Sequence, residues 1–467
     1  MKRVHFIGIC GTAMGTLAAM LKAKGCEVRG SDQGIYPPMS DFLAAQGVRL
    51  LEGYRAEHIT ADLDLVVVGN AISRGNPEVE EVLDRKIRYC SLPEAVRDEF
   101  LWAARSIVIA GTHGKTTTTS MAAWLLTHGG LDPSVLVGGI AGNFDSSFRL
   151  GGGRDFVIEG DEYDSAFFDK TAKFLKYLPD IAVVANIEFD HADIYPDLDA
   201  IRLVFRRLVN LIPRRGLLLV GADDPEARAL APLAPCRVET FGLADGADWQ
   251  AHGVRAAAAS TTFSLRRRGQ PFGQFELPAL GLHNVRNATA AIAVGAAAGL
   301  GVVALAEGLR RFSGVRRRLE HRGQAGGVDV YDDFAHHPTA IAETLSGIRS
   351  AYPGRRVWAV FEPRSATSCR RVFQDDFARA FGEGRADEVV VAAIYRSTVP
   401  EEERLSPARL VSDLKAAGVR ARHIPAVADI VATLADQARP ADLVVIMSNG
   451  GFDDIHRKLL AALAGKG

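Results

Sequence analysis

The sequence contains few cysteines, almost no net charge and no long apolar run. Its five cysteines are widely spaced and form no CxxC pair, which excludes a disulfide scaffold and a zinc ribbon and favours a reducing cytoplasm. The formal net charge is -1, so no general basic field is present to attract nucleic acid. The most apolar stretch, residues 290–306, is interrupted by "GLG" and is too short to span a membrane, so we expect two short packed helices there.

Short-period repeats and low-complexity segments are also absent from the sequence. Hydrophobic residues make up 48% and charged residues 24% of the chain, which is enough apolar material for packed cores and argues against disorder. The opening "MKRVHFIGICG" is basic and then apolar, but it continues directly into a predicted turn and helix, so we do not expect a signal peptide. A length of 467 residues exceeds what one core usually organises, and several domains are expected.

Apolar strands alternate with helical segments along most of the chain, which predicts an α/β fold with parallel sheets. We expect three domains: a Rossmann-like N-terminal domain over 1–104, a central P-loop ATPase domain over 105–313, and a Rossmann-like C-terminal domain over 314–467. Residues 236–280 alternate polar and apolar positions instead. They predict a small antiparallel sheet added to the parallel sheet of the central domain.

The segment "IAGTHGKTTTT", residues 109–119, resembles a phosphate loop with a shortened glycine spacing. It lies between a predicted strand and a predicted helix, where free backbone amides can face an anion. Lys115 can reach the β- and γ-phosphates, and the Thr116 hydroxyl is placed to bind Mg²⁺. The alternative, a glycine turn with an exposed lysine, explains the flanking strand and helix less well. The loop itself consists of Gly111, Thr112, His113, Gly114, Lys115, Thr116 and Thr117.

Two acidic clusters follow predicted strands of the same domain. Because the carboxyl ends of parallel strands meet at one edge of a sheet, both clusters should lie beside the phosphate loop. Together they predict a site for a hard cation, whereas a solvated acidic rim would explain one cluster better than two. The clusters contain Glu159, Asp161 and Glu162, and Asn186, Glu188, Asp190, His191 and Asp193.

Three further segments carry candidate nucleotide contacts. In "GLHNVRN", Asn284 and Asn287 share one side of a predicted helix and suit an adenine or ribose edge, although an N-cap cluster has the same pattern. "GVRRRLEHRG" supplies guanidinium groups that could reach a γ-phosphate, with a basic surface run as the alternative. "YDDFAHHPTA" favours nucleotide contact over zinc, because no further ligand spacing supports a metal. The residues concerned are Arg316, Arg317, Arg318, Arg322, Asp332, Asp333, His336 and His337.

The first glycine loop, "GICGTAMG", contains Gly8, Gly11 and Gly15 and does not match G-x-G-x-x-G. This mismatch weakens a nicotinamide interpretation. Asp32 still falls where a ribose-binding acid would lie, so another phosphate-bearing nucleotide fits.

Taken together, the motifs resemble the ATP-dependent Mur ligases of bacterial cell-wall synthesis. "GTHGKTTT", "NIEFDHAD", "GLHNVRN", "RRRLE" and "DDFAHHP" occur in the order typical of that family, and the resemblance covers nearly the whole chain. The opening glycine loop and "DDFAHHPTA" are similar to the members that use UDP-N-acetylmuramate. "YPPMS", "GNAISRGNPEVE", "EYDSAFFDK", "EPRSATS" and "MSNGGF" are similar to the members that attach a tripeptide.

The resemblance implies a role for each candidate residue. Lys115, His191 and Arg317 would be catalytic, and Thr116, Glu159 and His191 would bind metal. Asn284, Asn287, Arg317 and Asp332 would join the phosphate loop in binding ATP. UDP-sugar contacts would come from Gly11, Thr12, Ser31, Asp32 and Asn70. Arg364 and Asn449 are candidates for binding peptide carboxylates, although an ion pair would also account for Arg364.

The expected reaction joins L-alanyl-γ-D-glutamyl-meso-diaminopimelate to UDP-N-acetylmuramate through an acyl phosphate, with ATP and Mg²⁺, in peptidoglycan recycling. Ligation of free L-alanine in peptidoglycan synthesis is the alternative within the family. A nucleotide-binding regulator or transport ATPase is an alternative from another class, against which the two nucleotide-like loops argue. No nucleic-acid or membrane partner is expected.

Overall fold

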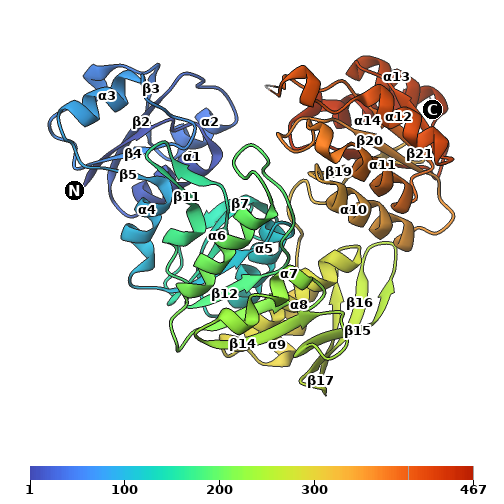
Figure 1. The fold of residues 1–467 in the computed structure, drawn as a ribbon, viewed down its shortest axis with the longest axis horizontal. Helices are drawn as coiled ribbons and strands as arrows, with labels where there is room; N and C mark the ends of the chain where they lie inside the picture. Colours follow the sequence, from blue (N-terminus) through green and yellow to red (C-terminus); the bar gives the residue numbers. More distant parts are fainter. Residues whose placement is uncertain (398, 466–467) are drawn as a thin grey trace. The chain divides into compact units, whose positions relative to one another are not determined.

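The computed structural model describes residues 1–397 and 399–465, which cluster into two compact units. Unit 1 contains Met1–Ile187, Asp199–Thr240 and Ala290–Leu300. Unit 2 contains Glu188–Leu198, Phe241–Thr289 and the described part of Gly301–Gly467. The α/β class is confirmed: sheets of five, ten and six strands follow one another along the chain, beside one short hairpin (Figure 1).

The N-terminal sheet is parallel, with strand order β3-β2-β1-β4-β5. The order reverses at β1, so β2 and β4 lie on either side of it, as in doubly wound nucleotide-binding folds. Ile7 pairs with both Ser31 and Val68, which brings three carboxyl ends to one edge. The elements are β1 (Arg3–Ile7), α1 (Thr12–Ala23), β2 (Glu27–Asp32), α2 (Met39–Ala45), β3 (Arg49–Glu52), β4 (Leu65–Val68), α3 (Pro77–Asp84), β5 (Tyr89–Ser91) and α4 (Leu92–Val96).

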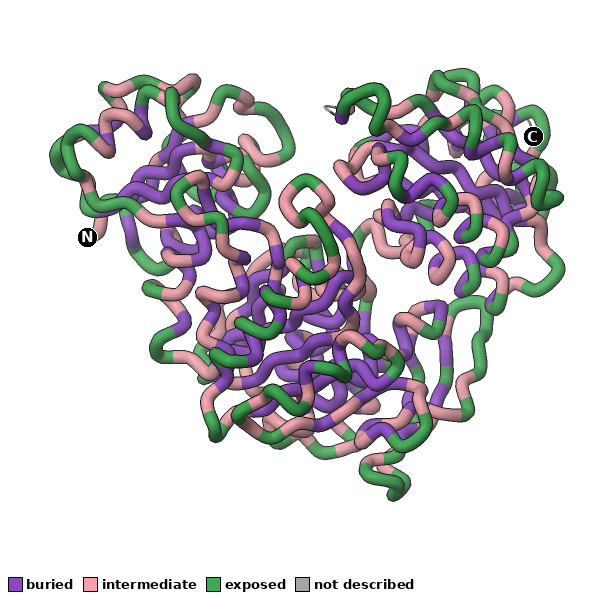
Figure 2. The backbone as a smooth tube through the Cα atoms, in the orientation of Figure 1, coloured by how far each residue is buried: buried purple, intermediate pink, exposed green. Residues whose placement is uncertain are grey.

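A second parallel arrangement follows in unit 1, in which β6 lies between β12 and β9. The middle residues of its central strands are apolar and buried, as expected for a parallel sheet that is covered on both faces (Figure 2). The elements are β6 (Arg105–Ala110), α5 (Lys115–His128), β7 (Ser134–Ala141), β8 (Ser146–Arg149), β9 (Asp155–Gly160), β12 (Ile181–Val184), α6 (Leu198–Asn210), β13 (Leu217–Gly221), α7 (Pro225–Arg228) and β14 (Arg237–Gly242). A separate antiparallel hairpin consists of β10 (Asp164–Ala166) and β11 (Asp169–Ala172).

The small antiparallel sheet predicted near 236–280 is present. Strands β15 (Trp249–Ala256), β16 (Thr261–Arg267) and β17 (Gln270–Leu277) pair in sequence as an antiparallel meander. The last two residues of β14 pair with the start of β15, so the meander continues from that strand. The apolar run after it forms two helices, α8 (Leu282–Ala297) and α9 (Val302–Arg310), as predicted.

The C-terminal sheet has the strand order β18-β19-β23-β20-β21-β22 and is parallel except for β18. Alternate residues of β20 enter opposite cores: Phe361 packs with helices α10 to α12, and Trp358 packs with α13 and α14. Both faces are therefore covered by helices (Figure 1). The elements are β18 (Glu320–Ala325), β19 (Val328–Asp333), α10 (Pro338–Ala351), β20 (Val357–Phe361), α11 (Gln374–Glu383), β21 (Glu388–Val391), α12 (Pro407–Ala416), β22 (Arg420–His423), α13 (Val427–Gln437), β23 (Leu443–Met447) and α14 (Ile455–Ala464).

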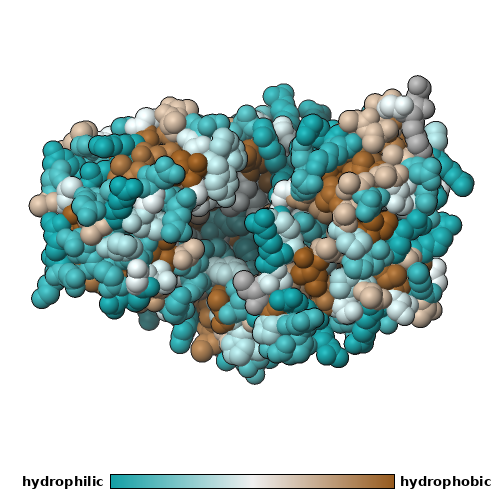
Figure 3. All heavy atoms as spheres, turned by 90° about the horizontal axis from the view of Figure 1, so that it is seen from above, coloured by the Kyte–Doolittle hydropathy of each residue, from teal (hydrophilic) through white to brown (hydrophobic). Residues whose placement is uncertain are grey.

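Hydrophilic residues predominate over the face seen in Figure 3, with hydrophobic ones among them in small groups. Within residues 1–397 and 399–465, no helix combines the length and the apolar character needed to cross a bilayer.

Candidate functional site

The predicted phosphate loop connects β6 to α5 in a conformation that only glycine tolerates well. Gly111 has φ 136° and Gly114 has φ 80°. A Cβ on Gly111 would lie 3.2 Å from the backbone nitrogens of Ala185 and Asn186, so the loop passes very close to the end of β12. Helix α5 begins at Lys115 without a side-chain cap, which leaves amides at its N-terminus for an anion.

Asn186 fixes the backbone of this loop. Its carbonyl accepts the Thr112 amide at 3.0 Å, and its side-chain oxygen accepts the His113 amide at 2.8 Å. The predicted cluster after β12 therefore supplies the residue that shapes the loop. Thr117, the remaining predicted loop residue, is buried in the first turn of α5.

The Lys115 ammonium lies folded over its own loop. It donates hydrogen bonds to the carbonyls of Gly111 at 2.8 Å and Thr112 at 3.1 Å, and pairs with Glu162 at 2.9 Å. Burial by itself lowers the pKa of Lys115, but the charges of Glu162 and Asp161 outweigh burial and the net shift is upward. Lys115 is therefore a positively charged group beside the predicted phosphate loop.

The three acids at the carboxyl end of β9 and directly after it have separate partners. Glu159 faces the loop: its Oε1 accepts the Thr116 hydroxyl at 3.0 Å, and its Oε2 accepts the Gly138 amide at 2.7 Å. Asp161 instead pairs with Lys173 at 2.6 Å. Burial raises the pKa of Asp161, but the charges of Lys173 and Lys115 outweigh burial and lower the pKa to about 2. Thr116 and Glu159 thus present adjacent oxygen ligands, the donor type that Mg²⁺ prefers, so the residues present fit the predicted ion.

The predicted UDP-sugar residues lie at the carboxyl edge of the N-terminal sheet. Gly11 and Thr12 are exposed at the start of α1, which has no side-chain cap, and Asn70 follows β4. Asp32 ties two loops together, since its carboxylate accepts the amides of Cys10 at 2.8 Å and Gly34 at 3.2 Å. Four of the five predicted residues are thus brought to one edge, although no ligand contact tests their role.

Ser31, the fifth, points into the interior. Its hydroxyl is fully buried and donates to Glu78 at 2.6 Å. Glu78, with no exposed surface, also lies 2.9 Å from His5 Nε2 and 2.7 Å from His58 Nδ1. Burial raises the pKa of Glu78, but hydrogen bonds from His5 and Ser31 outweigh it and lower the pKa. Sequence reasoning missed this hub; its one local sign is an acid in the first turn of α3, beside the Asn76 cap.

In unit 2, Arg317 and Asp332, two of the predicted ATP contacts, lie close together at the carboxyl edge of the C-terminal sheet. Arg317 Nη2 donates to the carbonyls of Ser448 at 2.6 Å and Gly450 at 2.7 Å, and its Nε lies 3.5 Å from Asp332 Oδ2. Burial raises the pKa of Asp332, but His456 and Arg317 outweigh it and lower the pKa. The guanidinium is therefore held by two carbonyls with an acid beside it.

Asn284 and Asn287 lie on one side of α8, as their spacing predicts. Both are buried, and Asn287 Nδ2 donates to Asn284 Oδ1 at 3.2 Å. Asn284 Nδ2 donates to the Leu280 carbonyl at 2.8 Å. These bonds fix the orientation of the amides but do not test nucleotide binding.

The predicted peptide residues follow neighbouring strands. Arg364 follows β20 and stacks on Tyr395 with its guanidinium 3.8 Å from the ring centroid; it lies 3.8 Å from Glu362. Asn449 follows β23, and within the described residues its buried Oδ1 has no hydrogen-bond partner. Arg364 is thus stacked on Tyr395 and paired with Glu362, as the ion-pair interpretation expects, and its peptide contact stays a prediction.

His191 lies in the loop after β12, in unit 2, with φ 55°. Neighbouring Asp190 accepts the His191 amide at 2.7 Å. Burial raises the pKa of Asp190, but His191, His336 and His337 outweigh it and lower the pKa. The predicted site residues are accordingly divided: the phosphate loop, Glu159 and the UDP-sugar set belong to unit 1, and His191 with the remaining residues belongs to unit 2.

Comparison with known proteins identifies the family. The Mur ligase family catalytic domain matches residues 3–99, the Mur ligase middle domain matches 109–295, and the Mur ligase glutamate ligase domain matches 317–450. The UDP-N-acetylmuramate–L-alanyl-gamma-D-glutamyl-meso-2,6-diaminoheptandioate ligase of Escherichia coli is 42% identical over 99% of both chains. The chain belongs to the Mur ligase family.

Two further Mur ligases are similar over nearly their full length. The UDP-N-acetylmuramate–L-alanine ligase of Desulfosudis oleivorans is 38% identical, covering 96% of this chain and 95% of its own. The crystal structure of a murein peptide ligase from Psychrobacter arcticus matches with a TM-score of 0.72 and 36% identity, covering 99% of both chains. The predicted family resemblance is confirmed.

Sequence reasoning about this Mur ligase missed the partners that hold Arg317. The carbonyls of Ser448 and Gly450 follow β23, which is distant from Arg317 in the sequence, and no local sequence pattern predicts these contacts. Glu320 accepts the Arg317 amide at 2.8 Å, and its position three residues later in "RRRLE" was a usable sign.

Proposed function

We propose that this Mur ligase joins the tripeptide L-alanyl-γ-D-glutamyl-meso-diaminopimelate to UDP-N-acetylmuramate, using ATP and Mg²⁺. The observation that carries the proposal is the phosphate loop, with Lys115 and the Thr116–Glu159 pair beside it, in a chain of this family. The tripeptide acceptor is supported by the higher full-length identity to a relative named for that reaction.

A carboxylate is a poor electrophile and must be activated before an amine can attack it. We assign Lys115 to the transferring γ-phosphoryl group, where its positive charge offsets the charge that develops during transfer. Thr116 and Glu159 would hold Mg²⁺, which neutralises charge on the phosphate oxygens. The γ-phosphoryl group passes to a carboxylate oxygen of the lactyl group, and ADP leaves.

The acyl phosphate then reacts with the peptide amine. The amine nitrogen attacks the acyl carbon, a tetrahedral intermediate forms, and inorganic phosphate leaves as the amide bond is completed. Water must be excluded, because it would hydrolyse the acyl phosphate. Arg317 and Asp332 contribute nucleotide contacts in this proposal, and His191 a metal contact.

The remaining assignments concern binding. Gly11, Thr12, Asp32 and Asn70 hold the UDP-sugar at the edge that the N-terminal sheet provides. Asn284 and Asn287 bind the adenine side, and Arg364 and Asn449 bind the peptide. A recycling role, in the cytoplasm where both nucleotides are available, goes with a tripeptide acceptor.

The L-alanine ligase remains the second candidate, because a relative with that name is 38% identical over nearly the whole chain. The two are separated by incubating the purified protein with ATP, Mg²⁺ and UDP-N-acetylmuramate, and adding either tripeptide or L-alanine. We expect phosphate release and amide product with the tripeptide. Product with L-alanine alone would select the second candidate, and no amide product with either would reject both.

A further inference from the structure

The loop after β12, residues 188–197, is fixed within unit 2 by segments that are far away in the sequence. It carries Asp190 and His191 and has no helix or strand of its own before α6. A loop of this kind cannot hold a side chain in one place unless other parts of the molecule fix it. The contacts that fix it come from the turn after β20 and from the start of α10.

Thr367 makes the most buried of these contacts. Its hydroxyl donates to Asp190 Oδ1 at 2.5 Å, and Thr367 and Asp190 are 2% and 4% exposed. The same oxygen accepts the backbone amide of His191 at 2.7 Å. The carboxylate therefore connects a hydroxyl on one segment to the backbone of His191 on the other. His191 needs such support, because its φ of 55° is uncommon for a residue with a side chain.

Thr367 is itself held in a rigid turn. Ser368 Oγ accepts the amides of both Arg364 and Ser365 at 2.9 Å, and the Cys369 amide donates to the Ser365 carbonyl at 3.0 Å. These bonds close the turn on itself, so the Thr367 hydroxyl is presented in a fixed direction. The turn also carries Arg364, the predicted peptide residue.

The start of α10 holds the preceding part of the loop. Thr339 Oγ1 donates to Glu188 Oε2 at 2.6 Å. His337 Nδ1 accepts the Thr339 amide, which leaves Nε2 as the donor to the Phe189 carbonyl at 3.2 Å. The Phe189 ring stacks on Phe373 with centroids 5.9 Å apart. The loop is thus fixed at Glu188, Phe189 and Asp190, immediately before His191.

We propose that Thr367 is a positioning residue of the ligase: through Asp190 it fixes the backbone of His191 and couples the turn that carries Arg364 to that histidine. The inference rests on the proposed function. A hydroxyl suits this role, since it donates to a buried carboxylate without adding a charge. Removing it leaves Asp190 buried with one donor fewer and releases His191.

The test is Thr367→Val, which removes the hydroxyl and keeps the shape, with Thr367→Ser as the rescue. We expect kcat to fall about 10- to 100-fold, as for the loss of residues that orient a metal ligand, and the KM for ATP to stay unchanged. The Mg²⁺ concentration for half-maximal activity should rise. In the metal-free protein, amide hydrogen exchange over residues 188–197 should accelerate, and the serine variant should restore both readouts.

Thr171→Val is the matched control, because Thr171 also donates to an aspartate, Asp169, at 2.6 Å but in the β10–β11 hairpin. It should leave kcat and loop exchange unchanged. Normal kcat in Thr367→Val, or lowered kcat without faster exchange of the loop, overturns the proposal. If Thr367→Val fails to fold, Thr367→Ala, which also lacks the hydroxyl that Asp190 accepts, decides by the same exchange measurement. A wild-type protein that forms no amide product refutes the proposed function instead, while the exchange measurement still tests the link between Thr367 and the loop.

Discussion

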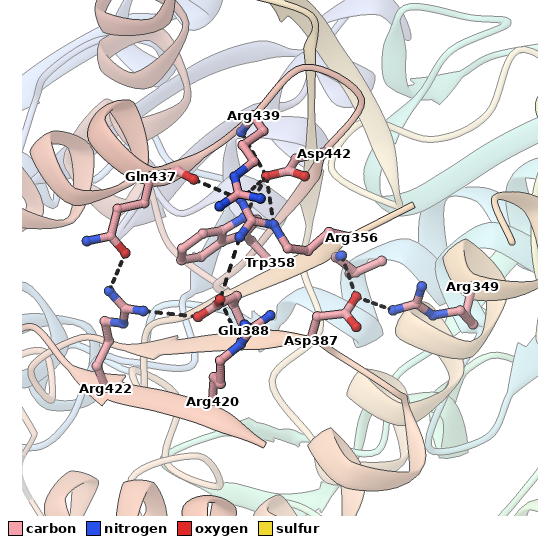
Figure 4. A network of polar contacts seen from close by, with 11 residues as sticks. Arg349, Arg356, Trp358, Asp387, Glu388, Arg420, Arg422, Gln437, Arg439 and Asp442 are labelled. Atoms are coloured by element: carbon pink, nitrogen blue, oxygen red, sulfur yellow. Dashed lines mark hydrogen bonds and ion pairs between the residues drawn. The ribbon is translucent and has the colours of Figure 1, made fainter. Parts of the chain in front are cut away.

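Buried acids lie at both ends of the strands in the C-terminal sheet, but their surroundings differ between the two ends. At the amino ends, Asp442 Oδ2 accepts hydrogen bonds from Arg356, from Trp358 Nε1 at 3.1 Å and from the Arg439 amide at 2.9 Å. Glu388 lies within 3.7 Å of Arg356 and 3.0 Å of both Arg420 and Arg422 (Figure 4). Buried acids at this edge are therefore fully paired with arginine.

At the carboxyl ends, burial prevails over pairing at two of the buried acids, Asp333 and Glu362. Burial raises the pKa of Asp333 and of Glu362, despite nearby Arg318 in the first case and a hydrogen bond from Ser448 in the second. Asp332 Oδ1 lies 3.3 Å from His456 Nε2, the contact that lowers the pKa of this third buried acid. Incompletely paired buried groups cost stability, and parallel sheets bind their ligands at this edge.

The central sheet repeats the contrast. At the amino ends of β6 and β9, Arg105 and Asp155 form a bidentate pair with distances of 2.5 and 2.9 Å. At the carboxyl ends, the cation is Lys115, a flexible side chain that pairs with Glu162 at one oxygen. The amino ends thus carry a bidentate pair that holds two strands together, whereas the carboxyl ends carry the lysine that we assign to the transferring phosphoryl group.

Lys115→Ala should give the largest effect and tests the carboxyl ends directly. Loss of the ammonium should lower kcat for ligation by at least about 100-fold, because a charge that stabilises phosphoryl transfer is gone. Binding of UDP-N-acetylmuramate, measured by calorimetry, should survive. Lys170→Ala, which removes an exposed lysine paired with Asp164, is the control and should ligate normally. Loss of UDP-substrate binding in Lys115→Ala would contradict separate sites.

Asp442→Ala should break the amino-end network and affect stability instead. Asp442 is only 6% exposed, and its removal leaves Arg356 without its closest acid, so we expect a loss of about 3–5 kcal/mol in the free energy of unfolding. Glu403→Ala, which removes an exposed partner of Arg370, should cost less than about 1 kcal/mol. Denaturant titration measures both. If Asp442→Ala kept normal stability but lost ligation, the amino ends would serve function and not stability, contrary to our expectation.

The sequence predicted the succession of strands, loops and helices along the chain. It did not predict which side chains from distant segments contact one another. The strand, glycine loop and helix at 105–128 were predicted because their signals are local: an apolar run, two glycines and a helical segment. Glu159 was placed beside the loop because strand ends share an edge. Ser31 was predicted to contact the UDP-sugar, yet its hydroxyl donates to Glu78, a partner 47 residues away. Such long-range pairing is set by packing, which single-sequence patterns do not contain.

Glu362→Gln should change the free energy of unfolding less than Asp442→Ala does, and in the opposite direction. The substitution removes a buried charge and keeps an acceptor for the Ser448 hydroxyl, which donates at 2.5 Å. We expect the free energy of unfolding at pH 7 to rise by about 0.5–2 kcal/mol, as happens when strained functional groups are relieved. The KM for the tripeptide should rise, because Arg364 loses a charged neighbour. Destabilisation would show that Glu362 is a structural acid like Asp442.

The pH dependence of stability gives the smallest effect and separates the two edges by sign. The pKa of Glu362 is raised from 4.5 on folding, so below that raised value the folded state binds the proton more readily than the unfolded state. The advantage of Glu362→Gln over wild type should therefore be full at pH 7 and disappear as the pH falls toward 4.5.

For Asp442, burial raises the pKa but Arg356 and the Arg439 amide outweigh it, so its pKa lies below the unfolded value of 3.8. The advantage of wild type over Asp442→Asn should accordingly persist down to pH 4 and shrink only below it. Denaturant titrations of the three proteins between pH 3.5 and 8 measure both trends, and parallel pH profiles for the two substitutions would remove the distinction between the edges.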